Sequence, residues 1–340
     1  MRAASPLFRK PQRRTAGSVR KQGRGAALLA AMLTVTLVAT FAAAALWQQW
    51  RSVEVETAER ARIQSAWILI GALDWSRLIL REDSLARAGD GTDNLAEPWA
   101  VPLEEARLSS FLAANRNVSQ VEDASTDTAD AFLSGRIIDL QSRMNLRNLA
   151  GNGTVDPVAL TQFTRLFEGL SLPQQQLDTI AQAIVRAVAT SGEASAAPLM
   201  PRTVAQLGWW GIPASTIEAL TPYVTLLPAP TRVNLNTASA LVLWASINQL
   251  DMPDAQRLVQ TRDARHFRSE SDASRLVGST AELTGATHTV ASTYFEVQGR
   301  LRLGSVVVQE RSLVLKQRGV ARTLWRERGS FVEPVANAAR

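Results

Sequence analysis

The sequence of 340 residues contains no cysteine, and this absence excludes three kinds of site. There can be no disulfide framework, no thiolate ligand for a metal ion and no thiol nucleophile. Only two histidines occur, His266 and His288, and they lie far apart in the sequence. The chain also lacks a nucleophile-elbow serine, a glycine-rich phosphate loop and an H-E-x-x-H motif. No catalytic constellation can be assembled, so we expect a protein that is not an enzyme.

Acidic residues are absent from the first 25 positions, and charges of either sign are absent from residues 26–47. About 20 apolar residues in a helix are enough to span the hydrocarbon core of a bilayer. Eight basic residues precede this run, which predicts a cytoplasmic N-terminus and places the later residues on the other side. The same eight residues dominate the formal charge of +6, because the rest of the chain carries about −2. A nucleic-acid partner is therefore not implied.

Three interpretations of the apolar run remain open at this point. It can be a retained signal anchor, or a cleaved secretory signal with Ala43-Ala44-Ala45 as the A-x-A-like site. In the third interpretation, Arg24-Gly25 directly before the run resembles the substrate of prepilin peptidase. That enzyme cuts after the glycine on the cytoplasmic side, so the basic leader is lost and the apolar helix is kept.

The residues after the apolar run predict one continuous helix that ends at about Arg81. Its outer half is amphipathic, because apolar residues recur at helical spacing at Ile63, Trp67, Ile70 and Leu73. We expect this stripe to pack on the globular part of the same chain. The helix is therefore expected to be half in lipid and half on a folded domain.

The rest of the chain changes its period twice. Within residues 82–149, residues 82–134 are polar and turn-rich, and a β-like run near Ile137 follows from Gly135. Residues 150–285 read as helices, with the first helical stretch from Asp156 and a second helix that Pro173 starts. Residues 286–327 alternate apolar and polar side chains, with turns at Gly304-Ser305 and Arg318-Gly319, which predicts a three-stranded antiparallel meander. We expect the strand near Ile137 to join this sheet across the helical insertion, and residues 328–340 to form a tail. The predicted fold class is α+β.

One motif favours a different class of protein. Val233-Asn234-Leu235-Asn236-Thr237 looks like the start of the helix-hairpin-helix domain of membrane-anchored DNA-uptake receptors, with Asn236 or Thr237 as the N-cap of the next helix. Such modules bind phosphate through the amides of a Gly-x-Gly hairpin. The hairpin here, residues 248–254, has no glycine, contains Pro253 and carries two acids. A DNA-uptake receptor is therefore the alternative function, without its phosphate-binding hairpin.

Several blocks taken together resemble the minor pseudopilin K family of type II secretion systems, also called general secretion pathway protein K. Their order and spacing carry the resemblance, which runs from about Arg24 to about Arg318. The blocks are Gly25 followed by AALL, Glu97-Pro98-Trp99, Gly135-x-Ile137-x-Asp139-Leu140-Gln141 with Asn145-Leu146-x-Asn148-Leu149, Thr221-Pro222-Tyr223-Val224-Thr225, and Val233-Asn234-x-Asn236-Thr237-Ala238.

The resemblance implies a pilin-like fold with a long N-terminal helix, a small antiparallel sheet and a large inserted all-α domain. It implies that residues 1–25 are a leader removed by prepilin peptidase after Gly25, with Ala26 as the N-methylated mature N-terminus. Ala30 is then mature position five, where most pilins carry a glutamate and members of family K typically do not. The protein would be a single-pass inner-membrane protein with a periplasmic C-terminal domain.

The resemblance also implies partners and a function. The partners are minor pseudopilins I and J in a tip complex, with H and the major pseudopilin G as further candidates, and no nucleic acid. The function is to help initiate assembly of the pseudopilus and the export of folded proteins from the periplasm across the outer membrane.

Calcium is associated with this family, but the sequence departs from the family at the relevant place. Many members carry an acidic, tyrosine-containing run after the first helices of the insertion. The corresponding stretch here, residues 186–194, has one acid and cannot form a multi-carboxylate calcium site unaided. We expect no cofactor and no metal in this lobe, and a site elsewhere remains open.

Overall fold

The computed structural model describes residues 23–85, 90–110, 131–189, 198–278, 281–304 and 306–329. The chain divides into two compact units, residues 1–60 and residues 61–340. Most of the predicted leader and the tail from residue 330 onward lie outside the described residues. The sheet and the helices after α1 belong to the second unit, whereas α1 has residues in both units. The proposed domain boundaries at residues 150 and 285 therefore stay a prediction.

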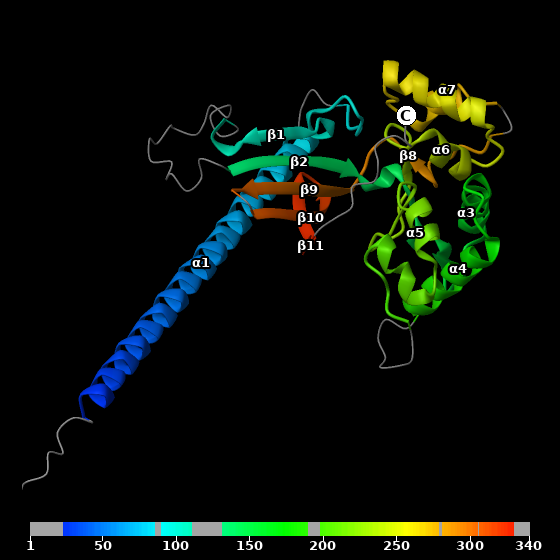
Figure 1. The fold of residues 1–340 in the computed structure, drawn as a ribbon. Coiled ribbons are helices and arrows are strands. Elements are labelled where there is room, and N and C mark those ends of the chain that lie inside the picture. Colours follow the sequence, from blue (N-terminus) through cyan, green and yellow to red (C-terminus); the bar gives the residue numbers. More distant parts are fainter. Residues whose placement is uncertain are drawn as a thin grey trace, which may run out of the picture. The chain divides into compact units, whose positions relative to one another are not determined.

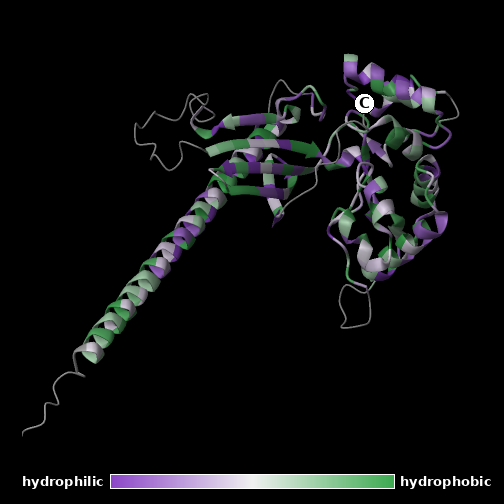
Figure 2. Cartoon of the chain, viewed as in Figure 1, coloured by the Kyte–Doolittle hydropathy of each residue, from purple (hydrophilic) through white to green (hydrophobic). Residues whose placement is uncertain are grey.

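Helix α1 (Gly23–Leu85) is one unbroken α-helix of 63 residues (Figure 1). Figure 2 shows hydrophobic colouring along its N-terminal part and mixed colouring after it, as the uncharged run predicts. Among the described residues, it is the one helix long and apolar enough to cross a membrane, judged by length and composition. Trp47 and Trp50 form an edge-to-face pair with centroids 6.1 Å apart at the end of the apolar run. Tryptophans favour the boundary between lipid and water, so this pair suits the end of a membrane span.

The second unit contains a five-stranded antiparallel sheet in the order β1-β2-β9-β10-β11. The predicted meander is confirmed, and so is the pairing of the strand near Ile137 with it, because β2 lies beside β9. Strand β1 was not predicted. The strands are β1 (Leu103–Arg107), β2 (Ala131–Asp139), β9 (Tyr294–Leu303), β10 (Val306–Gln317) and β11 (Val320–Arg328).

The turn between β10 and β11 shows why the meander is readable from sequence. Gln317 pairs with Val320, so Arg318-Gly319 is a two-residue turn, and both residues have positive φ angles of 52° and 74°. A two-residue turn with two positive φ angles matches the natural twist of a hairpin, and glycine tolerates this conformation best. The local sequence therefore indicates both the turn and the register of the adjoining residues, as far as the β-bulge between Leu313 and Val314.

The outer part of α1 packs on one face of this sheet. Leu69, Leu73 and Leu80 are almost fully buried, and they contact apolar side chains that alternate along β2 and β9. Trp99, in the short 3-10 helix η1 (Pro98–Ala100), joins the same core with its ring edge against Phe295. The expected packing of the amphipathic half on its own domain is confirmed.

Between β2 and β9, the chain forms a helical lobe with its own apolar core. Its first two α-helices begin at Pro157 and Gln174, next to the predicted starts at Asp156 and Pro173. The helices are α3 (Pro157–Gly169), α4 (Gln174–Ala189), α5 (Ala214–Leu220), α6 (Ala240–Ser246), α7 (Met252–Ala264) and α8 (Glu270–Ser274), with 3-10 helices η3 (Leu140–Ser142), η4 (Leu146–Leu149) and η5 (Val204–Trp210).

Short two-residue strands complete the lobe, and these were not predicted. They are β3 (Met144–Asn145), β4 (Ala150–Gly151), β5 (Thr154–Val155), β6 (Val224–Thr225), β7 (Val233–Asn234) and β8 (His288–Thr289). β3 pairs with β6, and β7 pairs with β8, both in parallel. Each of these pairs joins segments far apart in the chain, so local sequence carries little information about them.

The predicted N-cap of α6 is wrong. Ser239 caps this helix by accepting a hydrogen bond from the Val242 amide. Asn236 is buried and pairs through both amide atoms with the backbone of Phe267, at 2.8 and 2.9 Å. Thr237 donates to the carboxylate of Asp139 at 2.6 Å. These two residues have the right chemistry for a cap, but contacts distant in sequence use their side chains instead.

Candidate functional site

The predicted processing residues lie at the start of α1. Gly25, Ala26 and Ala30 are helical and exposed, and a Cβ atom added at Gly25 would meet no other atom within 4 Å. Ala26 and Ala30 are four residues apart, so they lie on the same face of the helix one turn from each other. The structure therefore brings the proposed mature N-terminus and position five together.

A second candidate site is a buried polar junction that links the helical lobe to the sheet. Its centre is Asp139, at the end of β2, which is fully buried. One carboxylate oxygen accepts a hydrogen bond from the backbone N–H of Gln141 at 2.8 Å. The other accepts from Asn234 at 2.9 Å, Thr237 at 2.6 Å and Ser292 at 2.7 Å. Burial raises the pKa of the Asp139 carboxyl, and these hydrogen bonds oppose the rise by favouring the ionised form.

Further amides of the same sequence blocks extend the junction. Gln141 donates to the Arg232 carbonyl and accepts from both the backbone and the hydroxyl of Thr293. Asn145 bonds the backbone of residues 227 and 229, and Asn148 bonds both backbone groups of Thr231. Each amide therefore satisfies main-chain groups of a segment more than 80 residues away.

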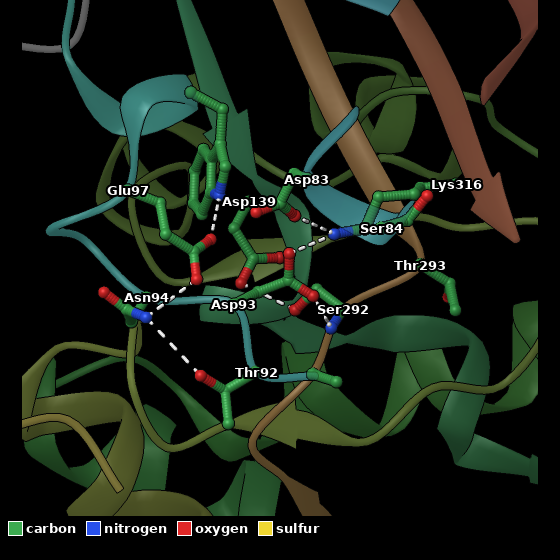
Figure 3. Close-up of polar contacts among 12 residues, drawn as sticks. Asp83, Ser84, Thr92, Asp93, Asn94, Glu97, Asp139, Ser292, Thr293 and Lys316 are labelled. Atoms are coloured by element: carbon green, nitrogen blue, oxygen red, sulfur yellow. Dashed lines mark hydrogen bonds and ion pairs between the residues drawn. The ribbon is translucent and has the colours of Figure 1, made fainter. Parts of the chain in front are cut away.

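An acidic group lies beside this junction (Figure 3). Asp83 at the end of α1, Asp93 and Glu97 offer carboxylate oxygens that all lie within 4.8 Å of one another. Lys316 of β10 pairs with Asp83 at 2.8 Å and also with Asp93. Burial raises the pKa of Asp93 to about 6, although Lys316 opposes the rise. Burial also raises the pKa of Glu97 to about 7, against the hydrogen bond from the Trp99 indole.

Three close carboxylates suggest a metal site, but their partners are already present. Lys316 supplies the cation between Asp83 and Asp93, and Asp93 also accepts from the Ser292 amide at 2.7 Å. Glu97 is held by Asn94 at 2.8 Å and by Trp99. Because Lys316 already supplies a cation to this group, a metal ion would have to displace the lysine or share these oxygens with it. The group is better explained as structural. Lys316 pairs with Asp83 and Asp93, and burial raises the pKa of Asp93 and of Glu97.

The stretch from which sequence analysis excluded calcium is only partly described. Residues 186–189 form the end of α4, and residues 190–194 lie outside the described residues. The expectation about calcium in this lobe therefore stays a prediction.

The two histidines lie apart, as the sequence indicates. His288 is buried and contacts the hydroxyls of Ser246 and Thr287 at 3.0 and 2.9 Å. Burial lowers the pKa of His288 to about 4, so its ring is neutral at pH 7. His266 instead contacts the Asp90 carboxylate at 2.6 Å. Neither histidine has a nucleophile and an orienting acid arranged around it among the described residues.

The hairpin of the DNA-binding alternative lies between α6 and α7. Asp251 caps α7 by accepting from the Asp254 amide at 2.7 Å, and Pro253 has no amide proton to donate. A phosphate approaching this helix terminus would meet two carboxylates. The helix pair is therefore present, but its turn is unsuited to a phosphate backbone.

Sequence analysis missed the junction, although its residues were in view. Asp139, Gln141, Asn145, Asn148, Asn234 and Thr237 all belong to the blocks that carry the family resemblance. These polar side chains lie among apolar residues in the sequence, and this pattern could have predicted a buried hydrogen-bond network. Polar side chains are generally buried only when they are hydrogen-bonded. Their partners lie on distant segments, and spacing alone does not identify them.

Comparison with known proteins gives a consistent result. Residues 142–229 and residues 233–298 each match a family profile described as type II secretion system protein K. A protein named type II secretion system protein K from Pseudomonas aeruginosa is 26% identical over 310 residues, which cover 84% of this chain and 86% of that protein. One chain of the crystal structure of the GspK-GspI-GspJ complex from enterotoxigenic Escherichia coli superposes with a TM-score of 0.60. It is 18% identical, and the match covers 81% of this chain and 99% of that one.

Proposed function

This chain belongs to the protein K family of type II secretion systems, and we propose that it acts as a non-enzymatic minor pseudopilin at the tip of the pseudopilus. There it would help initiate pseudopilus assembly and the export of folded proteins from the periplasm across the outer membrane. The observation that carries this proposal is α1, in which an uncharged run suited to lipid continues unbroken into the stripe that packs on the sheet.

The helix would serve two purposes in such a subunit. Its first part, residues 26–47, would hold the protein in the inner membrane, with the basic residues before it in the cytoplasm. Its second part, from Ala61 onward, anchors the folded domain by burying leucines against the sheet. The folded domain would then lie in the periplasm.

We propose that prepilin peptidase cleaves after Gly25 and that Ala26 becomes the N-methylated mature residue. Mass spectrometry of the protein purified from cells that contain the peptidase tests this step. The mature polypeptide should begin at Ala26 and carry one extra methyl group. A first residue beyond Trp47 would leave no membrane helix and would contradict the proposal as a whole.

We propose that minor pseudopilins I and J are the direct partners, with H and the major pseudopilin G as further contacts. The support is the fold likeness to a chain of a complex whose title names GspI and GspJ. Co-purification of the full chain from detergent with tagged I and J tests it, and an unrelated single-pass protein from the same membrane is the control. Failure to retain I or J under conditions that keep the fold intact would contradict the tip complex.

The same preparation distinguishes the alternative function. A DNA-uptake receptor should bind duplex DNA with a steep loss of affinity as salt rises. We expect no such binding by the mature protein, because the residues after position 25 carry about −2 of formal charge and the α7 terminus is capped by Asp251. Salt-dependent DNA binding that Asp251→Ala strengthens would favour the receptor.

A further inference from the structure

The sheet face opposite α1 carries a cavity with two guanidinium groups that form no ion pair within the described residues. Side chains alternate between the two faces of the sheet along β2 and β9. Leu133 and Val297 face α1, so the residues next to them in sequence face away from α1. On that second face, a cavity of about 210 Å³ is lined by Ser134, Arg136, Gln298, Arg300 and Gln309, and no residue of α1 lines it. These residues belong to β2, β9 and β10, which lie side by side in the sheet (Figure 1).

The strand register places the two arginines next to each other. Arg136 pairs with Gln298, and Arg300 pairs with Ser134, so the arginines are diagonal neighbours. Diagonal neighbours on one face of an antiparallel pair are roughly 7–8 Å apart, which long side chains can span. Two positive charges at this spacing repel each other unless an anion lies between them.

One of the arginines is held in place by its neighbours. The Arg136 Nε donates to the Gln298 side-chain oxygen at 2.7 Å, and the Gln298 amide in turn donates to Glu296 at 2.5 Å. This chain of bonds uses Nε of Arg136 and leaves its two terminal nitrogens for another acceptor. A guanidinium that is oriented in this way loses less entropy when it binds a carboxylate.

Three acids near the cavity are already paired. Glu105 bonds Arg302 at 2.6 Å, and Glu327 bonds Arg311 at 2.7 Å. Glu310 also borders the cavity, but it pairs with Gly299, so its carboxylate lies on the α1 face, where it bonds Arg328 at 2.6 Å. Neither Arg136 nor Arg300 forms an ion pair within the described part of the chain. Glu296, the other diagonal neighbour of Arg136, accepts from the Gln298 amide and forms no ion pair within the described residues. Two arginines therefore face one such acid, and the cavity keeps a net positive charge.

We propose that this cavity, called here the arginine cavity, binds a carboxylate side chain from an acidic segment of a partner polypeptide. The guanidinium groups of Arg136 and Arg300 can each donate two hydrogen bonds to a carboxylate, and the Ser134 hydroxyl and the Gln298 and Gln309 amides lie in the same cavity. Pro102 also borders the cavity, whereas Val101 and the Leu103 side chain belong to the α1 side of the sheet. The complementarity of two guanidiniums to a carboxylate is therefore what favours an acidic segment of a polypeptide.

Binding of a labelled peptide to the full chain in detergent tests this site. The peptide alternates glutamate and leucine, and a second peptide has glutamine in place of glutamate. Arg300→Gln and Arg136→Gln should each weaken binding of the acidic peptide about tenfold, the equivalent of one charge-assisted hydrogen bond. The glutamine peptide should bind weakly to every variant. Because the basic leader is common to all variants, its contribution cancels.

Arg322→Gln is the matched control. Arg322 is an exposed arginine on β11, opposite Leu315 and outside the cavity, so its loss changes the net charge equally. Its affinity for the acidic peptide should stay within about twofold of the parent protein. An equal loss in all three variants, or in none, would overturn the proposal. Competition by inorganic phosphate as effective as that by the peptide would also overturn it, in favour of a free-anion site. The experiment needs no other pseudopilin, so its failure leaves the proposed function untouched.

Discussion

Asn234 is the single side chain that joins most parts of the buried junction. Its amide nitrogen lies 2.9 to 3.0 Å from the Asp93 carbonyl, the Asp139 carboxylate and the Ser292 hydroxyl, and its oxygen accepts from the Asn236 amide at 2.9 Å. The residue is fully buried, so water cannot replace these bonds. The helical lobe and the sheet therefore depend on one amide for much of their polar contact.

Replacement of Asn234 by alanine tests this dependence. We expect the free energy of unfolding to fall by about 2–4 kcal/mol, because a charged acceptor and a backbone carbonyl lose a donor in a buried site. Chemical denaturation of the full chain in detergent measures the change. Asn248→Ala is the matched control, since its side chain bonds Glu282 near the surface and water can take its place, so we expect a loss below about 1 kcal/mol. Similar losses at both positions would contradict the role of the junction.

Glu97 makes the stability of the second unit depend on pH. Burial raises the pKa of Glu97 from 4.5 to about 7. Between pH 4.5 and pH 7, Glu97 is therefore protonated in the folded state and ionised in the unfolded state. Stability should therefore increase as pH falls from 8 to 6.5, by at most about 1 kcal/mol from this group. Asp93, with a pKa raised to about 6, acts in the same direction at lower pH.

Thermal denaturation of the parent protein and of Glu97→Gln at several pH values measures this dependence. In Glu97→Gln, most of the stability change between pH 8 and pH 6.5 should be absent. The window stops there because His288, with its pKa lowered to about 4, destabilises the fold on further acidification as the unfolded state takes up protons. A parent protein whose stability falls on going from pH 8 to 6.5 would show that Glu97 is not the dominant group.

At the scale of elements, two glycines permit close approaches, Gly299 between β9 and α1 and Gly135 between β2 and β9. Gly135 of β2 and Gly299 of β9 lie opposite each other, and the Leu69 side chain lies 3.1 Å from the place of a Cβ at Gly299. A Cβ at Gly135 would lie 2.7 Å from the Gln298 carbonyl oxygen. Backbone atoms cannot move aside cheaply, so side chains at these positions would separate the strands or the helix from the sheet.

Gly135→Ala tests the close approach. We expect a loss of about 1–3 kcal/mol in the free energy of unfolding, since the added methyl group overlaps with backbone. Gly285→Ala is the control, because a Cβ there meets nothing within 4 Å. Denaturation of both variants under the same conditions gives the comparison. A neutral Gly135→Ala would mean that β2 and β9 tolerate more separation than the structure indicates.

The elements that were predictable from sequence are those with local signals. β9 to β11 could be assigned from alternation and from two-residue turns, and α3 and α4 from Asp156 and Pro173. β1 was missed because it is short, polar and lies at the edge of the sheet, where only its pairing with β2 marks it as a strand. The N-cap of α6 was misplaced because Asp139, 98 residues away, takes the Thr237 hydroxyl.

For the candidate site, the sequence indicated which blocks matter but not why. The blocks around Asp139 and Asn234 were used only to identify a family. Their physical role is to form hydrogen bonds with one another across the junction. These bonds join residues far apart in the chain, so the local spacing of residue types does not predict them. The arginine cavity has the same origin, because Arg136 and Arg300 become neighbours only through the register of β2 and β9.

At the scale of the whole molecule, we propose that the absence of a charge at position 30 affects how the subunit fits a bundle of like helices. In most pilins a glutamate at mature position five can pair with a neighbour's N-terminal ammonium inside the apolar bundle. An unpaired charge there is expensive, so the pair helps to dictate assembly. This chain has Ala30 one helical turn from Ala26, and a subunit that lacks the acid suits the end of a filament better than its shaft.

Ala30→Glu should therefore let the protein enter the shaft or disturb tip formation. Pseudopilus length and the secretion of a reporter protein, measured in cells that carry the variant as their sole protein K, give the result. Ala30→Gln is the matched control, since it has nearly the same shape without the charge, and it should leave both measurements close to the parent. Unchanged length and secretion in Ala30→Glu would refute the charge argument, provided that the variant is inserted and processed normally. An equal defect in both variants would assign the effect to polarity in the membrane rather than to the ammonium pair, because glutamine cannot pair with an ammonium as an anion does.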